Sequence, residues 1–118
     1  MKILIVNDNA AMSEMIRSFL PKTFDDICEC EDSFDALNYY RSFRPDWVLM
    51  DWEMKRMNSL ATTREILADF PEAKIVFVTQ HDDPELRAAA TGAGARAVVL
   101  KDDLSALRPI LQGKDDVC

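Results

Sequence analysis

Short apolar runs alternate with segments of helical periodicity along the whole chain. Each run is bounded by polar or turn-forming residues and has the length of a strand buried in a sheet. Strands that are joined by helices pair in parallel, and the helices pack on both faces of the sheet. The pattern predicts an α/β fold with a five-stranded parallel sheet, whose second, more polar strand is expected at an edge. The predicted strands are residues 2–6, 26–31, 47–50, 74–78 and 97–100.

Between the first two strands, apolar residues recur at the spacing of an amphipathic helix. Pro21 is expected to end this helix, because proline cannot donate the next helical hydrogen bond. The residues expected to face the core form a methionine-rich stripe: Met12, Met15, Ile16, Phe19 and Leu20.

The next two helices are predicted over residues 33–43 and 59–70. Ser33 is the expected N-cap of the first of them, because its hydroxyl can accept a hydrogen bond from a free backbone N–H. The side chains expected to face inward from this helix are Phe34, Leu37 and Tyr40.

Two more helices are predicted after the fourth and fifth strands. Asp83 and Pro84 have the order of an N-cap and a first helical residue, and Gly92 or Gly94 can end that helix in a left-handed cap. The last helix begins near Asp103 but contains Pro109, so a short helix, a kink or two short turns are expected.

The chain has 118 residues and a formal net charge of −7, from 14 basic and 21 acidic residues. This length suits one domain. The acidic balance argues against a nucleic-acid partner and against a membrane surface, since both attract basic proteins. No apolar run approaches the roughly 20 residues of a membrane helix. The composition therefore indicates a single globular domain.

The three cysteines are Cys28, Cys30 and Cys118. An odd number without a disulfide-like spacing indicates a reducing compartment, the cytoplasm. Cys28 and Cys30 are expected on one face of a strand. Packing residues are favoured over metal ligands there, because no second Cys or His pair completes a site.

Polar side chains stand where four of the predicted strands end. Asn7 and Asp8 follow the first strand, and Asp51, Thr79 and Lys101 follow the third, fourth and fifth. Ligands of parallel α/β sheets bind at the carboxyl ends of the strands. Carboxylates suit Mg²⁺, while an ammonium group and a hydroxyl suit a phosphoryl group. These residues predict a site where Asp51 is the nucleophile.

Five segments at the predicted strand ends and helix starts form a recognisable series: Ile5 to Asn9, Glu29 to Leu37, Pro45 to Met54, Val78-Thr79 and Gly94 to Lys101. In their order and spacing, they resemble the receiver domain of bacterial two-component response regulators. The resemblance covers about residues 1–108, and the receiver domain is assigned to residues 1–112, with 113–118 expected to be a disordered tail. It implies a flavodoxin-like three-layer sandwich with strand order 2-1-3-4-5.

The resemblance also implies the role of each site residue. Asp51 is the expected phosphoacceptor, Thr79 the switch hydroxyl and Lys101 the contact to the acyl phosphate. Mg²⁺ is the expected cofactor, held by the side chains of Asp8 and Asp51 and by the backbone carbonyl of Glu53, with Asn7 as an indirect ligand. The chain is expected to accept a phosphoryl group and lose it slowly, without being an enzyme otherwise.

The partners implied by the resemblance are a sensor histidine kinase or a phosphotransfer protein. A small acyl phosphate is the alternative donor. A second copy of the chain and a downstream effector are further candidate partners.

Several residues depart from the family pattern. Asn7 replaces a usual acidic residue, which predicts weaker Mg²⁺ binding. Lys55 replaces a usual proline, Asn58-Ser59 a frequent Asp-Gly, and Val98 a common aromatic residue. Asp102 follows Lys101 where proline is frequent, so the bond between them is expected to be trans, because a cis bond before a residue other than proline costs roughly 3–4 kcal/mol.

Two other functions remain open. Asn7 and Val98 motivate a degenerate receiver that acts only as a phosphorylation-independent interaction module, although Asp8, Asp51, Thr79 and Lys101 argue against it. A phosphatase with an aspartate nucleophile would need a second Asp two residues later, where this chain has Glu53.

Overall fold

The computed structural model describes residues 1–32, 35–53 and 59–112. All five predicted strands are present in one sheet, paired in parallel in the order β2-β1-β3-β4-β5. This confirms the predicted strand order and places the polar strand β2 at an edge. The strands are β1 (Lys2–Val6), β2 (Asp26–Cys30), β3 (Trp47–Asp51), β4 (Ile75–Thr79) and β5 (Ala97–Leu100).

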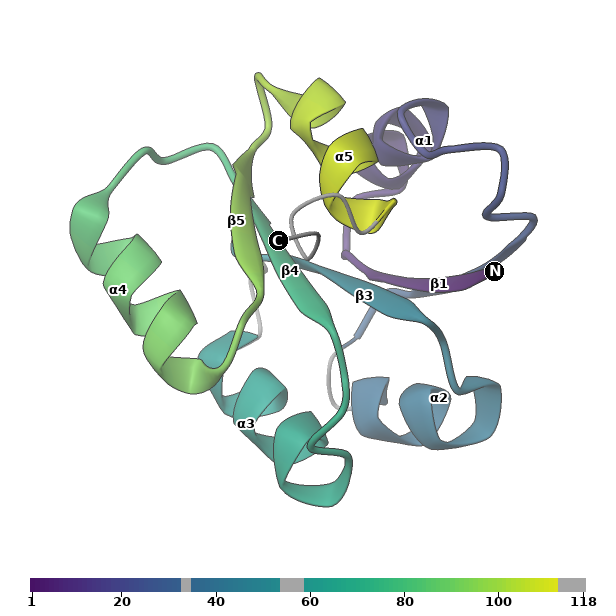
Figure 1. Cartoon of the computed structure of the whole chain (residues 1–118), viewed down its shortest axis with the longest axis horizontal. Coiled ribbons are helices and arrows are strands. Elements are labelled where there is room, and N and C mark those ends of the chain that lie inside the picture. The colour runs from purple at the N-terminus through teal and green to yellow at the C-terminus, as the bar shows by residue number, and fades with distance from the viewer. Residues whose placement is uncertain (33–34, 54–58, 113–118) are drawn as a thin grey trace.

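Helices cover both faces of the sheet and complete the three-layer sandwich (Figure 1). α1 (Ala10–Ser18) and α5 (Leu107–Leu111) lie on one face. α2 (Ala36–Phe43), α3 (Ser59–Asp69) and α4 (Pro84–Ala93) lie on the other. The predicted α/β architecture with helices on both faces is therefore confirmed.

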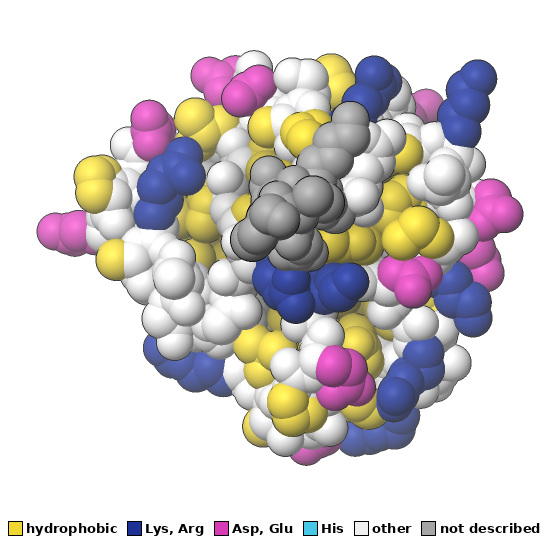
Figure 2. Space-filling view, in the orientation of Figure 1, with side chains coloured by type: hydrophobic (Ala, Val, Ile, Leu, Met, Phe, Trp, Pro, Cys, Tyr) yellow, Lys and Arg dark blue, Asp and Glu magenta, His cyan; other side chains and the backbone are white. Residues whose placement is uncertain are grey.

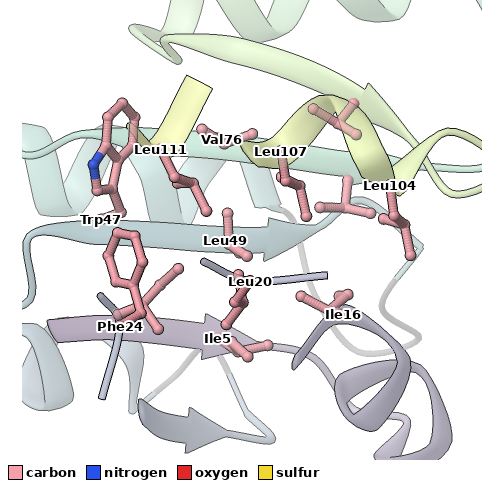
Figure 3. Close-up of a cluster of buried hydrophobic side chains, with 13 residues drawn as sticks. Ile5, Ile16, Leu20, Phe24, Trp47, Leu49, Val76, Leu104, Leu107 and Leu111 are labelled. Atoms are coloured by element: carbon pink, nitrogen blue, oxygen red, sulfur yellow. The ribbon is translucent and has the colours of Figure 1, made fainter. Parts of the chain in front are cut away.

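The face under α1 and α5 is held by the first of two apolar cores (Figure 3). Ile5, Leu49 and Val76 project from three neighbouring strands and are at most 1% exposed. Ile16 packs onto them from α1, and Leu107 packs from α5. Burial of such side chains contributes roughly 1.5–3 kcal/mol each, which fixes both helices on the sheet.

The opposite face carries the second core. Val6, Met50 and Phe77 alternate along their strands with residues of the first core, as the two-residue period of a strand requires. Tyr40 from α2 and Ile66 from α3 cover them. Strands buried on both sides explain the unbroken apolar runs of the sequence.

Cys30 is buried in this second core, and Cys28 packs against it from the same face of β2. The prediction that both thiols share one face is confirmed. Burial raises the pKa of the Cys30 thiol to about 11. The thiol therefore stays protonated at neutral pH.

The prediction for the first helix was partly wrong. Met15, expected in the core, is 49% exposed, and α1 ends at Ser18 rather than at Pro21. Met15 lies about 100° around the helix from the buried Ile16, outside the apolar stripe. Ser13 is the second buried residue of this helix.

The last predicted helix consists of two short consecutive helical segments. A short 3₁₀ helix, η1 (Leu104–Ala106), precedes α5, which has only five residues. Pro109 is the third residue of α5. A backbone N–H at this position would have no acceptor within α5, so the proline removes no hydrogen bond of that helix. A short 3₁₀ segment followed by a short α-helix lies within the range expected there, which was a short helix, a kink or two short turns.

Some expectations concern residues outside those described. These are Ser33 and Phe34 at the start of the second helix, Lys55 and Asn58 after β3, and the tail 113–118. The described part of α2 begins at Ala36, and Asp35 stands at its N-cap without a side-chain hydrogen bond.

Charged side chains of both signs are intermixed on the face shown in Figure 2. Lys and Arg do not merge there into one continuous surface, which agrees with the acidic composition. Within the described residues, no helix combines the length and the apolar character needed to cross a membrane.

α4 begins and ends as predicted. The side chain of Asp83 accepts a hydrogen bond from the Glu85 N–H, Pro84 is the first helical residue, and Gly94 closes the helix with a φ of 106°. A left-handed residue at this position favours glycine, because a Cβ would be strained. A Cβ built on Gly94 would also lie 2.5 Å from Leu67 Cδ1.

Gly94→Ala is therefore expected to lower the free energy of unfolding by about 1–2 kcal/mol. Gly92→Ala is the matched control, since a Cβ there meets no atom within 4 Å and lies inside the helix. The control should be more stable than the parent by up to about 1 kcal/mol. Urea unfolding followed by circular dichroism measures both, and effects of the same sign would contradict this account.

Candidate functional site

The register of the sheet brings the predicted site residues together at the carboxyl ends of the strands, which we call the rim of the sheet. Asp51 and Thr79 are the last residues of β3 and β4, and both are buried. Lys101 directly follows β5, and its backbone N–H donates to the Thr79 carbonyl at 2.7 Å. Asn7 and Asp8 follow β1, whose Val6 pairs with Met50 beside Asp51.

The Asp51 carboxylate is the most deeply buried charge of the site, at 3% exposure. Its Oδ1 lies 3.0 Å from Lys101 Nζ and accepts a hydrogen bond of 3.0 Å from the Glu53 N–H. The Ser59 hydroxyl donates to the Asp51 carbonyl at 2.7 Å and so connects the start of α3 to the end of β3. Burial raises the pKa of Asp51, and the Lys101 ammonium opposes that rise.

The Thr79 hydroxyl already has partners on both sides. It donates to Glu53 Oε1 at 2.9 Å and accepts a hydrogen bond from the His81 N–H at 3.1 Å. His81 itself is an exposed loop residue. The sequence placed Thr79 at this rim correctly, but it did not reveal that the hydroxyl is directed at Glu53.

The sequence did not reveal the role of the Glu53 side chain. Only its backbone carbonyl was expected at the site. Its Oε1 also accepts the Gln80 N–H at 2.6 Å, and its Oε2 lies 3.3 Å from Lys101 Nζ. Burial raises the pKa of Glu53, but the hydrogen bonds from Gln80 and Thr79 and the charge of Lys101 outweigh it, so the net pKa is lowered. The signal in the sequence was a second carboxylate two residues beyond Asp51, which lies within reach of the Lys101 ammonium group.

Asn7 shapes the loop that carries Asp8. It is 3% exposed, its N–H donates to the Cys30 carbonyl, and its Oδ1 accepts the Asn9 N–H at 2.9 Å. Asn9 in turn caps α1 through its side chain. The buried Nδ2 of Asn7 has no hydrogen-bond partner among the described residues. Asn7 is thus a turn residue with one unused donor at the rim.

The donor set fits a magnesium ion. Asp8 and Asp51 follow neighbouring strands, and Mg²⁺ is commonly bound by one or two carboxylates while it keeps several waters. Residues 1–32, 35–53 and 59–112 contain no group of three or more His, Cys, Asp or Glu side chains that could hold a metal by themselves. Besides the carboxylates, the ligands of the ion would be carbonyl oxygens and water molecules. The free N–H group of Asn7 could donate a hydrogen bond to such a water.

The departures from the family pattern at Val98 and Asp102 lie within the described residues. The bond between Lys101 and Asp102 is trans, as predicted, and the described chain contains no cis peptide bond. Val98 is partly buried and packs against the core under α2, α3 and α4.

This fold, with a buried aspartate, a lysine and a threonine at the carboxyl edge of the sheet, defines a class of signalling domain. The model of the family described as "Response regulator receiver domain" matches residues 3–112 of the chain. The chain belongs to this family.

Two relatives from Bacillus subtilis (strain 168) illustrate the similarity. The uncharacterized transcriptional regulatory protein YhcZ is 34% identical over 105 residues, which are 86% of this chain and 49% of that protein. The chemotaxis protein CheY is 32% identical over 101 residues, 85% of this chain and 84% of CheY. The chain therefore spans about half the length of YhcZ and most of the length of CheY.

Solved structures show the same fold. A two-component response regulator of the LuxR family from Aurantimonas sp. SI85-9A1 superposes with a TM-score of 0.83 at 24% identity, over 98% of this chain and 83% of that one. The isolated receiver domain of RcsB from Salmonella enterica serovar Typhimurium superposes with a TM-score of 0.83 at 20% identity, over 99% and 89%.

The buried charge of Asp51 predicts a pH-dependent effect on stability. A raised pKa means that the folded state binds the proton more tightly than the unfolded state does, so ionised Asp51 destabilises the fold above that pKa. Asp51→Asn is expected to raise the free energy of unfolding by about 1 kcal/mol at pH 7 in EDTA. This gain should shrink as the pH falls through the raised pKa toward the ordinary value of 3.8.

Urea unfolding at several pH values measures this difference. Asp102→Asn is the matched control, because it removes the same charge from an exposed residue next to Lys101, and it should change stability by less than about 0.5 kcal/mol. A loss of stability in Asp51→Asn at pH 7 would show that the ion pair with Lys101 outweighs the burial of the charge.

Proposed function

We propose that the chain is a phosphoacceptor switch of a two-component phosphorelay, modified on Asp51 in a Mg²⁺-dependent reaction. The observation that carries this proposal is a buried Asp51 carboxylate with Lys101 Nζ at 3.0 Å and the Thr79 hydroxyl on the adjoining strand. Phosphoryl transfer needs mainly positioning and neutralisation of charge, and these side chains supply both. The receiver domain is proposed to comprise residues 1–112.

The transfer step uses one oxygen of Asp51 as the nucleophile. That oxygen attacks the phosphorus of the donor, a new P–O bond forms, and the electron pair of the broken bond stays on the leaving oxygen or nitrogen. Lys101 neutralises charge on the phosphoryl oxygens, and Thr79 donates a hydrogen bond to one of them. Later, a water oxygen attacks phosphorus, and the Asp51 carboxylate and inorganic phosphate are released.

Mg²⁺, when bound, neutralises negative charge on the phosphoryl oxygens. Asp8 and Asp51 would hold it with their carboxylates and Glu53 with its backbone carbonyl, and Asn7 would contact a bound water. The proposed donors are a phosphohistidine on a sensor kinase or phosphotransfer protein and a small acyl phosphate. A shift between two states of the face around β4 and β5 would pass the signal to a downstream effector.

Intact-mass measurement tests the switch. Incubation with acetyl phosphate and Mg²⁺ is expected to add one phosphoryl group, about 80 Da, to the parent chain. The gain should disappear in EDTA and in Asp51→Asn, because each lacks one component of the transfer step. A gain that persists in Asp51→Asn would identify a different nucleophile.

The charge missing at Asn7 gives a second prediction. Asn7→Asp is expected to tighten Mg²⁺ binding by about tenfold, because it adds a carboxylate beside the proposed ligand Asp8. Isothermal titration calorimetry measures the affinity. Asn9→Asp is the control, since it adds the same charge to the same loop and retains the helix cap. Equal gains in both variants would mean that only general charge matters.

The phosphorylation-independent interaction module is the alternative function. The unused Nδ2 donor of Asn7, where a carboxylate would bind metal more strongly, is the observation that favours it. An unmodified mass together with undetectable Mg²⁺ binding would support this alternative over the switch.

A further inference from the structure

The two groups proposed to receive the phosphoryl oxygens are already in contact with another anion. Glu53 Oε1 accepts the Thr79 hydroxyl at 2.9 Å, and Glu53 Oε2 lies 3.3 Å from Lys101 Nζ. Lys101 Nζ also lies 3.0 Å from Asp51 Oδ1. One carboxylate thus spans the hydroxyl and the ammonium group beside the proposed nucleophile.

Counting protons shows that these contacts compete with a phosphoryl group. A threonine hydroxyl has a single hydrogen to donate. The Thr79 oxygen accepts the His81 N–H, so its own hydrogen is directed to Glu53. Phosphoryl oxygens without protons only accept hydrogen bonds, and therefore Thr79 cannot donate to one until it releases Glu53.

Two hydrogen bonds hold Oε1 of Glu53 in this position, whereas Oε2 accepts none from the described residues and has only the ion pair with Lys101. The Gln80 N–H donates to its Oε1 at 2.6 Å, in addition to Thr79. Hydrogen bonds to an ionised acceptor are about twice as strong as those between neutral groups. The side chain is only partly exposed, which limits the water that competes for these contacts.

We propose that the Glu53 side chain is an internal substitute for the phosphoryl group, which occupies Thr79 and Lys101 in the unmodified domain and must leave before Asp51 is modified. This inference rests on the proposed function. Glu53 acts as a gate: it stabilises the unmodified state and slows phosphoryl uptake. When the phosphoryl group is lost, the carboxylate returns to the same two groups.

Two substitutions separate the charge of Glu53 from its hydrogen bonds. Glu53→Gln keeps an oxygen that can accept from Thr79 and Gln80 but removes the charge that contacts Lys101. Glu53→Ala removes both and leaves the backbone carbonyl in place. With saturating Mg²⁺, Glu53→Ala is expected to take up phosphate from acetyl phosphate about five- to fiftyfold faster than the parent, and Glu53→Gln is expected to lie between.

A general effect of charge on the anionic donor is the main competing explanation. Glu85→Gln is the matched control, since Glu85 is an exposed carboxylate in the first turn of α4. Its rate should stay within about twofold of the parent, because exposed charges act weakly through salt and water. An acceleration in Glu85→Gln equal to that in Glu53→Gln would overturn the gate.

The backbone N–H of Gln80 gives a readout that does not depend on the rate. Its proton resonance should lie downfield in the parent chain and move upfield in Glu53→Ala, which lacks the acceptor. Beryllofluoride bound to a carboxylate mimics a phosphoryl group. Its addition together with Mg²⁺ should move the Gln80 resonance upfield in the parent as well. A Gln80 resonance that stays in place on this addition, while other rim resonances shift, would overturn the inference.

The failures are distinguishable. If the parent is modified and Glu53→Ala is no faster, the gate is wrong and the phosphoacceptor function stands. If neither the parent nor either Glu53 variant is modified, the proposed function fails and the gate fails with it.

Discussion

The buried carboxylate of Asp51 is the constraint on which the site depends. A charge that is 3% exposed at the end of a central strand is unfavourable unless nearby groups compensate it. Lys101 supplies the opposite charge at 3.0 Å, and the Glu53 N–H supplies a hydrogen bond. These contacts come from two segments that are 48 residues apart in sequence, so the chemistry of Asp51 requires that β3, β4 and β5 keep their register.

The two apolar cores maintain that register. Each central strand is buried on both faces, so a slip of one residue would move every side chain of that strand to the opposite core. The cores lie along the strands, whereas the polar residues follow at the strand ends. The fold can therefore bury enough apolar surface to be stable and still present a charged rim, because the two requirements fall on different parts of each strand.

Most of the fold was predictable because the strands are buried on both faces. Continuous apolar runs separated by helical periodicity leave few topologies, and Asp83, Pro84 and Gly94 marked the ends of α4 correctly. One error was made in applying the helical period to the first helix. Met15 has the right residue type for a core position, but its angle around α1 exposes it. For the site, the strand ends predicted which elements carry Asp51, Thr79 and Lys101. The direction of the Glu53 side chain was not predictable in this way, because it depends on Gln80 and Lys101, which are distant in sequence.

Glu53 also explains how the proposed phosphoryl site can be stable without its ligand. A phosphoryl site collects hydrogen-bond donors, which would lack partners in the unmodified state, and a cation, which here is also paired with Asp51. In this chain the lone hydroxyl hydrogen of Thr79, the N–H of Gln80 and part of the charge of Lys101 are all satisfied by one side chain. In the proposed reaction, the contacts that lower the energy of the unmodified state must be broken. Stability of the resting domain and speed of its modification are therefore opposed at Glu53, and the strength of its hydrogen bonds determines the balance between them.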